Sequence, residues 1–441
     1  MGFKKVVALL TCLTLATTTF FTGCGKSKSG DKNETVTVSV FDHKIEADSG
    51  LKKAAAAYEK AHPNVKVNIE SCGGSTDYAS VLEARLIADP PCIFNYAGVG
   101  ELPTLQDQLV DLSGENWVKK CKPSVLESAK GSDGKIYGMP MLIEGYGYLI
   151  NREIFESAGV DIDSMNTFEG QKKGFDKLKE AIDSGKLKQK YPQLNAVMSV
   201  PGKEAWVLGD HMLQAILNKD FKSSAEAFKA KTLPFSGADV YKQLVDFQVS
   251  YTSDAKKLSN LNAIDYKASV DSGFLLEKSA CIQQGTWIIP VVKEQSKDML
   301  SKLDFIPYNL PDGSTDGKYI AFPGQFWVIN KKVSEKQIQA SKDFLKWLYE
   351  SEEGKKITTE DCGFISPFDN AMADDNVLNQ KILKAYSSGN FIPGDLSLAG
   401  PPTWSKEIVG ASIQKYLAGL CKWEDVVKEA KDKWASLRAN S

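Results

Sequence analysis

The chain has 441 residues, 42% of them hydrophobic, and its 54 Lys and Arg nearly balance its 56 Asp and Glu, leaving a formal net charge of -2. This balance provides no electrostatic footprint for nucleic acid, and no polybasic membrane patch stands out beyond Lys4 and Lys5. The length is too great for one hydrophobic core and suits two or three packed units, so two lobes are the first expectation.

The N-terminal segment has the pattern of an export signal. A basic start is followed by an apolar run over residues 6–21, which ends at Gly23-Cys24. The run is too short and too rich in threonine for a stable membrane anchor, and a flexible polar stretch follows it. The segment resembles a bacterial lipoprotein signal, although Phe21 stands where that pattern usually has Leu.

That resemblance implies a signal peptide over residues 1–23, a lipidated Cys24 carrying palmitate, and a tether over residues 24–34. An ordinary secretory signal with an incidental cysteine is the alternative interpretation.

Strand and helix patterns alternate from residue 35 onward. Residues 35–41 alternate with period 2, residues 51–61 are alanine-rich with helical periodicity, and residues 65–69 form a second strand pattern. A helix is predicted over residues 77–88, with Asp77 near its start, and a short apolar strand over residues 92–96. The alternation predicts an α/β fold with parallel strands, whose ligands bind beyond the carboxyl ends of the strands. The loops after Phe41 and Asn95 are therefore candidate binding segments.

The cysteines and histidines exclude some kinds of site. Six cysteines beyond the N-terminal segment are widely spaced and include no CxxC pair, which favours buried free thiols over a disulfide framework. With only His43, His62 and His211 available, we expect no metal site and no cofactor.

Four motifs in chain order resemble family 1 extracellular solute-binding proteins, the maltose-binding-protein-like, sugar-binding subunits of ABC importers. They occupy residues 134–160, 284–287, 324–330 and 340–354. With the lipoprotein-like start, the resemblance covers nearly the whole chain. It implies a type II periplasmic-binding-protein fold with a hinge between two discontinuous α/β lobes. Lobe 1 would comprise residues 35–143 and 326–376, and lobe 2 would comprise residues 144–325 and 377–441.

The expected crossovers between the lobes lie at residues 144–147 and 324–326. Gly145 and Gly147 stand beside a strand-like run, which indicates backbone freedom where the chain changes lobe, or alternatively a simple bulge or turn.

A neutral sugar needs hydrogen-bonding side chains and aromatic rings that stack on its C–H faces. The motif order implies cleft aromatics at Trp206, Trp287 and Trp404, each of which could instead be a core or surface residue. Trp347 lies in an amphipathic register and is predicted to be core. Polar and hinge contacts are expected from the first-strand loop, the end of the strand over residues 92–96, and the two crossovers. The complete candidate ligand-binding set is His43, Lys44, Asn95, Tyr96, Glu144, Trp206, Trp287, Gln325, Phe326 and Trp404.

One departure from the family concerns specificity. Ala97-Gly98-Val99-Gly100 stands where maltodextrin-binding members carry acidic and basic residues, which argues against maltodextrin as the ligand.

These expectations describe a monomeric receptor anchored by lipid to the outer face of the cytoplasmic membrane, which delivers a sugar or oligosaccharide to an ABC permease. No GxSxG, HExxH, phosphate-binding or EF-hand motif occurs, so no enzymatic activity is predicted, although a glycosidase carboxylate pair stays an alternative. A non-sugar solute is the other alternative. Polyamines would favour several cleft carboxylates and metals would favour clustered His or Cys, which the candidate set lacks.

Overall fold

Nine strands form one sheet within the part of the chain that the computed structural model describes, namely residues 35–73, 77–368 and 372–439. The strand order is β2-β1-β3-β8-β4-β6-β5, with β7 paired to β4 and β9 paired to β8. The expected signal peptide, Cys24 and tether lie outside the described residues. The strands are β1 (Val36–Asp42), β2 (Val65–Ser71), β3 (Ile93–Tyr96), β4 (Met139–Asn151), β5 (Ala196–Ser199), β6 (Ser279–Gly285), β7 (Leu303–Ile306), β8 (Tyr319–Ile329) and β9 (Phe391–Pro393).

The α-helices vary from single turns to seventeen residues. They are α1 (Asp48–Ala61), α2 (Tyr78–Ala88), α3 (Leu102–Leu105), α4 (Pro123–Leu126), α5 (Arg152–Ser157), α6 (Phe168–Asp183), α7 (Met212–Leu217), α8 (Ser224–Lys229), α9 (Ala238–Ser250), α10 (Ile288–Gln295), α11 (Lys297–Lys302), α12 (Glu335–Glu350), α13 (Glu352–Lys356), α14 (Val377–Ser388), α15 (Ala411–Leu417) and α16 (Trp423–Ala439). Short 3-10 helices cover Ile45–Ala47, Gln106–Gln108, Val118–Lys120, Glu127–Ala129, Asp163–Asn166, Leu258–Ala263 and Ser397–Ala399. π-helical turns cover Val207–His211, Ala268–Phe274, Ile357–Asp361 and Trp404–Gly410.

The predicted βαβ start is confirmed. Strand β1 pairs in parallel with both β2 and β3, and α1 and α2 are the intervening helices. Asp77 is the N-cap of α2, because its side chain accepts a hydrogen bond from the backbone N–H of Ala79 at 3.2 Å. The carboxyl ends of β1 and β3 thus lie side by side, as the sequence predicted.

The sheet as a whole is mixed rather than parallel, which corrects one expectation. The pairs β3–β8, β4–β6, β4–β7 and β4–β8 are antiparallel, while β5–β6 and β8–β9 are parallel. The long strands β4 and β8 are antiparallel to each other and to β3, β6 and β7, which makes the centre of the sheet antiparallel.

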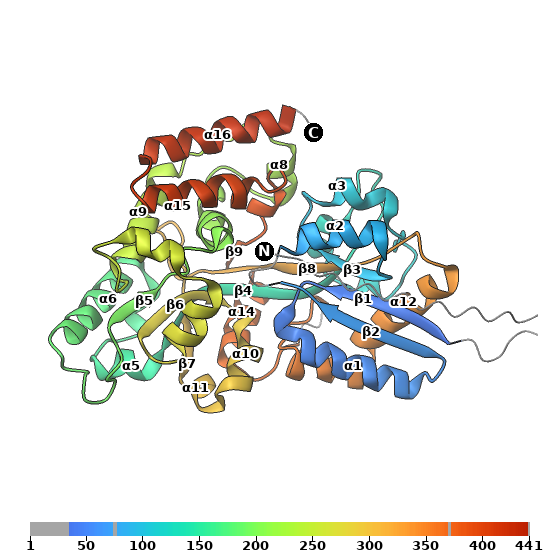
Figure 1. Cartoon of the computed structure of the whole chain (residues 1–441), viewed down its shortest axis with the longest axis horizontal. Coiled ribbons are helices and arrows are strands. Elements are labelled where there is room, and N and C mark those ends of the chain that lie inside the picture. Colours follow the sequence, from blue (N-terminus) through green and yellow to red (C-terminus); the bar gives the residue numbers. More distant parts are fainter. Residues whose placement is uncertain (1–34, 74–76, 369–371, 440–441) are drawn as a thin grey trace, which may run out of the picture. The chain divides into compact units, whose positions relative to one another are not determined.

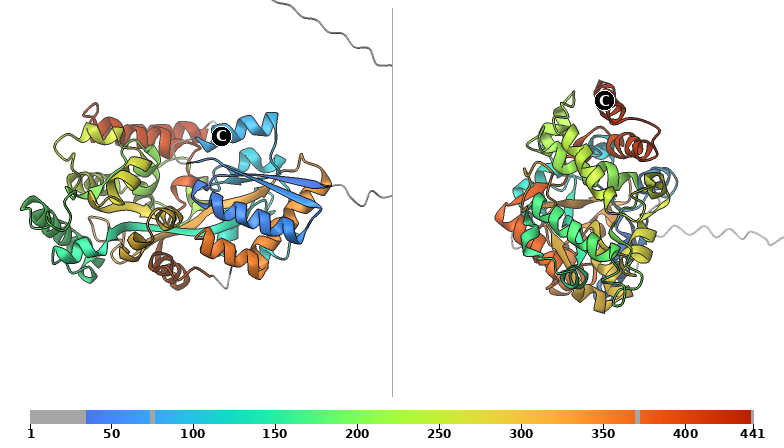
Figure 2. Two further views of the ribbon diagram at one scale, coloured as in Figure 1. Left: turned by 60° about the horizontal axis from the view of Figure 1, so that its bottom comes forward. Right: turned by 90° about the vertical axis from the view of Figure 1, so that its left-hand side faces the viewer.

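Strands β4 and β8 connect two halves of the described fold (Figure 1). One half contains β1, β2 and β3 with α1, α2, α3 and α12, and its hydrophobic core draws on residues 38–142 and 326–364. The other contains β5, β6 and β7 with α5, α6, α9, α15 and α16, and its largest core draws on residues 146–320 and 392–434. The turned view in Figure 2 shows β4 extending from one half into the other.

Trp347 of α12 is less buried than predicted. Its ring packs edge-on against Tyr58 of α1, with the centroids 5.4 Å apart, and it lines a surface groove between the two helices. The amphipathic register of α12 is otherwise as expected, since Phe344 and Leu348 are buried on its inner face.

The cysteines agree with the sequence analysis. Cys92, Cys281 and Cys362 are buried free thiols, and Cys72 and Cys421 are free thiols at partly exposed positions. Within the described ranges, no group of three or more His, Cys, Asp and Glu side chains is arranged to hold a metal ion. None of the helices in those ranges combines the length and apolar character needed to cross a bilayer.

Candidate ligand-binding site

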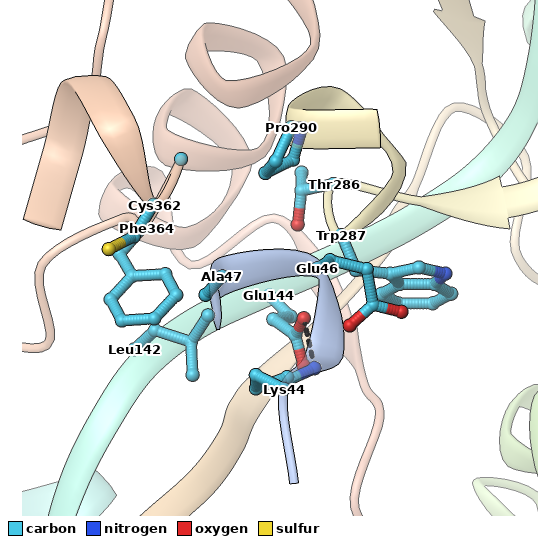
Figure 3. Close-up of a pocket in the computed structure, with 11 residues that line it drawn as sticks. Lys44, Glu46, Ala47, Leu142, Glu144, Thr286, Trp287, Pro290, Cys362 and Phe364 are labelled. Carbon is cyan, nitrogen blue, oxygen red and sulfur yellow. Dashed lines mark hydrogen bonds and ion pairs between the residues drawn. The ribbon is translucent and has the colours of Figure 1, made fainter. Parts of the chain in front are cut away.

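The loop after β1 brings His43 and Lys44 to the carboxyl ends of β1 and β3. The backbone N–H of His43 donates to Asn95 Oδ1 at 2.8 Å, and that of Lys44 donates to Asp42 Oδ2 at 3.0 Å. With its backbone held in this way, Lys44 reaches β4, where its Nζ lies 2.6 Å from Glu144 Oε1 (Figure 3). The ion pair therefore joins the first strand loop to the long connecting strand.

The Glu144 carboxylate projects from β4 where this strand pairs with β8, opposite Phe322. Its side chain is only 3% exposed, against 13% for Lys44. A Cβ on Gly324 of β8 would lie 2.0 Å from Glu144 Oε2, so only glycine leaves room for this carboxylate. Removing either partner would leave a buried charge uncompensated, which makes the pair important for the geometry of the site.

The crossover glycines of β4 serve close packing rather than backbone freedom, which corrects the sequence interpretation. Neither Gly145 nor Gly147 has a left-handed φ. A Cβ on Gly147 would lie 2.4 Å from the Ile306 carbonyl oxygen, and one on Gly145 would lie 2.7 Å from that of Ile320. Strand β4 is accordingly continuous through both positions.

Trp287 follows β6 and presents its indole beside Lys44. The ring folds back over Gly285, where a Cβ would lie 2.3 Å from ring atom Cζ3. Its Nε1 donates to Gln284 Oε1 at 2.6 Å, and Lys44 Nζ lies 5.8 Å from the ring centroid. Glu46 lines the same pocket as Trp287 (Figure 3). A partly exposed aromatic ring thus lies among hydrogen-bonding groups.

Further aromatic rings extend from Trp287. His211 lies 5.0 Å from Trp287 and 4.9 Å from Trp206, measured between ring centroids, and it stacks on Tyr146 at 4.6 Å. Tyr266 lies 5.9 Å from Trp206. The π-helical turn Val207–His211 places His211 in this wall, in agreement with the frequent occurrence of such turns at functional sites.

Burial sets the protonation of the groups behind this wall. It raises the pKa of Asp42 to about 7, an effect that Lys44 partly offsets. Burial also lowers the pKa of His43 and of His211 to about 3, and Lys44 acts in the same direction on both. Both imidazoles are therefore neutral at physiological pH and act as neutral hydrogen-bonding groups. His43 Nδ1 lies 3.0 Å from Gln325 Nε2, and His211 Nδ1 lies 3.1 Å from Gln283 Oε1.

A small pocket lies between these groups. The free volume in which a water-sized sphere can move is about 10 Å³, enough for roughly one water molecule. A drug-sized ligand needs a site of roughly 300–1,000 Å³. In this conformation the site is too tight for a sugar. The pocket is lined by Lys44, Glu46, Ala47, Leu142, Glu144, Thr286, Trp287, Pro290, Cys362, Gly363 and Phe364.

The structure brings together six of the predicted residues. Lys44, Glu144 and Trp287 line the pocket, His43 and Gln325 are hydrogen-bonded to each other behind it, and Trp206 belongs to the aromatic wall.

Four other residues of the predicted set, Asn95, Tyr96, Phe326 and Trp404, are buried in this conformation. Tyr96 and Phe326 are buried and stack on each other at 4.8 Å, because their strands β3 and β8 are paired at this position. Trp404 is fully buried, donates to the Ala430 carbonyl at 2.8 Å and packs against α16. Asn95 is fully buried and supports the His43 backbone.

Sequence reasoning missed Glu46, Gln284 and His211. Glu46 follows Lys44 by two residues, so extending the strand-end rule along the same loop would have found it. Gln284 begins the motif over residues 284–287, and its Nε2 is buried without a hydrogen-bond partner among the described residues. His211 carries no local signal, because only the packing of its π-helical turn brings it to Trp287.

The chain matches the bacterial extracellular solute-binding protein family over residues 53–385 and belongs to that family. Its members are binding proteins rather than enzymes. The chain is 22% identical over 362 residues to a multiple sugar-binding protein of Streptococcus mutans, a match that covers 79% of each chain. It is 28% identical over 142 residues to the melibiose/raffinose/stachyose-binding protein MelE of Bacillus subtilis, which covers 31% of this chain and 32% of MelE.

Solved structures show the same fold. The solute-binding protein RafE in complex with raffinose aligns with a TM-score of 0.69 at 17% identity, covering 92% of this chain and all of RafE. A sugar transporter from Bacillus licheniformis in complex with stachyose aligns with a TM-score of 0.66 at 18% identity, covering 91% of this chain and all of the other. The α/β fold expected from the family resemblance is thereby confirmed.

Proposed function

We propose that this protein captures a sugar or oligosaccharide between two lobes and delivers it to an ABC permease. The observation that carries the proposal is the Trp287 indole, which lies beside the Lys44–Glu144 ion pair and Glu46 at the ends of β1 and β6. An exposed ring face flanked by charged and amide hydrogen-bonding groups matches a sugar, which offers C–H faces and hydroxyls. The sugar-binding names of the two curated relatives support the same ligand class.

The ligand-contacting set that we propose is narrower than the sequence suggested. It comprises His43, Lys44, Glu46, Glu144, Trp206, Trp287 and Gln325. Of these, Lys44, Glu46, Glu144 and Trp287 line the pocket, and the others lie directly behind or beside it.

The two lobes correspond to residues 35–143 with 326–376 and residues 144–325 with 377–441. Two hydrophobic cores, one within each lobe, support this division, whereas a third core contains residues of both lobes. Because the pocket is too tight for a sugar, this conformation corresponds to a closed cleft, and ligand entry requires rotation of the lobes about the crossing strands.

Lipid attachment at Cys24 would keep the receptor at the outer face of the cytoplasmic membrane, as a monomer beside its permease. The sequence pattern around Gly23 and Cys24 supports this anchor. One acyl chain binds a membrane only marginally, so stable anchoring requires more than one chain on the processed cysteine.

A cationic solute is the second candidate. Asp42, Glu46 and Glu144 surround Lys44, and Glu101 and Asp210 face Lys406 near His43. Carboxylates therefore outnumber lysines around the cleft, a feature that the sequence analysis did not anticipate and that a polyamine or an amino sugar would exploit.

A thermal-shift screen of the purified protein distinguishes the two candidates. The panel contains raffinose, stachyose, melibiose and glucose as neutral sugars, and spermidine and glucosamine as cations. A ligand at 100 times its dissociation constant adds about 2.7 kcal/mol of stability, a readily measured shift. Stabilisation by a neutral sugar supports the proposal. Stabilisation by the cations alone would replace it with the second candidate.

A further inference from the structure

The loop over residues 97–100 lies directly against the 3-10 helix Ser397–Ala399. The backbone N–H of Gly100 donates to the Leu398 carbonyl at 3.2 Å. A Cβ on Gly100 would lie 2.5 Å from that same oxygen and 3.0 Å from the Gly400 oxygen, and one on Gly98 would lie 2.8 Å from Leu398 Cβ. Neither glycine has a left-handed φ, so both are required for space rather than for conformation. The contact is therefore a close backbone approach that only glycine permits.

The two sides of this contact belong to different hydrophobic cores. The loop follows β3, which packs in the core of the first half, while Ala399 is buried in the core of the second half. Ser397 is fixed to that second half, because its backbone N–H donates to Gln214 Oε1 at 3.0 Å. Val99, from the loop, packs against the second core. The glycines thus lie at a contact between the two proposed lobes that involves neither β4 nor β8.

Polar groups flank the glycine contact on both sides. Ser128 Oγ donates to Asp395 Oδ2 at 3.4 Å, again between the two halves. Glu101 follows Gly100 and faces Lys406, whose charge favours the ionised carboxylate against the effect of burial. Backbone and short polar contacts thus join the two halves here, beside the apolar contact of Val99.

We propose that Gly98 and Gly100 are positioning residues for closure of the cleft: they permit the loop over residues 97–100 to dock on Leu398 in the closed form, and so set ligand affinity without touching the ligand. The inference rests on the two-lobe closure described under the proposed function. A ligand held between the lobes has an apparent affinity reduced by the fraction of protein in which the lobes can approach each other. A methyl group on either glycine lowers that fraction by keeping the backbones apart.

The test measures closure without any ligand. Ser128→Cys and Asp395→Cys are introduced into the full chain, and the rate of disulfide formation with a copper–phenanthroline oxidant reports how often the halves meet. This rate is then measured in the Gly98→Ala and Gly100→Ala backgrounds. The matched control is Gly114→Ala, because a Cβ there has no neighbour within 4 Å. Single-cysteine variants correct for reaction with the native thiols.

The expected result is a rate at least tenfold lower in the Gly100→Ala background and lower in Gly98→Ala, with no change in Gly114→Ala. The thermal midpoints of the glycine variants, measured without the cysteine pair, should stay close to the parent. Equal rates in all backgrounds would overturn the inference. A large loss of thermal stability with an unchanged rate would also overturn it, by showing that the contact belongs to a permanent core.

Gly98→Ala keeps the test usable if Gly100→Ala does not fold, because its added carbon meets a side-chain carbon rather than a carbonyl oxygen. The outcome is separable from the proposed function. If the glycine variants crosslink more slowly but the protein binds no sugar of the panel, the role of the glycines in closure is supported and the sugar assignment is refuted.

Discussion

Replacing Trp287 by alanine tests the central element of the proposed site. Lys44 Nζ lies 5.8 Å from the centroid of the Trp287 ring, and the His211 and Trp287 ring centroids are 5.0 Å apart. Truncating Trp287 to alanine therefore removes one face of the pocket. For an aromatic anchor in a binding site, we expect a loss of about 2 kcal/mol or more in binding free energy. This corresponds to a dissociation constant about 30-fold higher or more.

The same change also affects stability, in a way that the structure predicts. Trp287 is partly exposed, so its truncation costs less than the roughly 3–5 kcal/mol typical of a fully buried tryptophan. The loss of its N–H leaves the buried Gln284 Oε1 without a donor, which adds about 1–3 kcal/mol. Trp287→Phe separates these effects, because it keeps a ring face and removes only the hydrogen bond and part of the area.

Trp404→Ala is the matched control. Trp404 is fully buried in the second core, so its truncation should cost the full large-to-small penalty, about 3–5 kcal/mol, while the remaining folded protein binds normally. Calorimetric titration and a urea midpoint on each variant measure affinity and stability separately. An unchanged affinity in Trp287→Ala, or a lost affinity in folded Trp404→Ala, would refute the assignment of the two rings.

Three further predictions follow from the chain and its fold. Cys24→Ser should release the protein from the membrane fraction, and a variant that stays membrane-bound with its signal cleaved would exclude the lipid anchor. The scattering radius of gyration should fall when a saturating ligand closes the cleft, whereas identical curves with and without ligand would count against hinge closure. Asp42 has a pKa of about 7 in the folded protein, above its usual 3.8. Between these two pH values the folded protein keeps a proton on Asp42 that the unfolded chain has lost. The contribution of Asp42 to the free energy of unfolding therefore declines as pH rises from about 4 to about 7. Asp42→Asn should therefore become increasingly more stable than the parent between pH 5 and pH 8, as measured by urea unfolding, and a constant difference across that range would contradict the pKa assignment.

Local sequence patterns were sufficient to predict the start of the fold. The period-2 alternation before Asp42 and the Asp77 cap are properties of adjacent residues, and they predicted β1, α2 and the adjoining strand ends correctly. The strand prediction also placed His43 and Lys44 beyond the carboxyl end of β1, because they directly follow that strand. The order of the four motifs predicted the family. The family resemblance in turn selected Glu144 and Trp287, which line the pocket.

Tertiary structure alone decided which of these side chains reach the cleft. Trp287 and Trp404 both occur beside small or turn-forming residues, yet one lies on Gly285 at the pocket and the other packs against α16, whose Ala430 and Trp434 lie far along the chain. Whether an indole is buried depends on which distant segment packs over it, and the local sequence pattern does not indicate that segment. The same holds for Gly98 and Gly100. In the sequence they stand where maltodextrin-binding members carry charged residues, whereas in the fold they allow a close backbone contact with Leu398, a residue about 300 positions further along the chain.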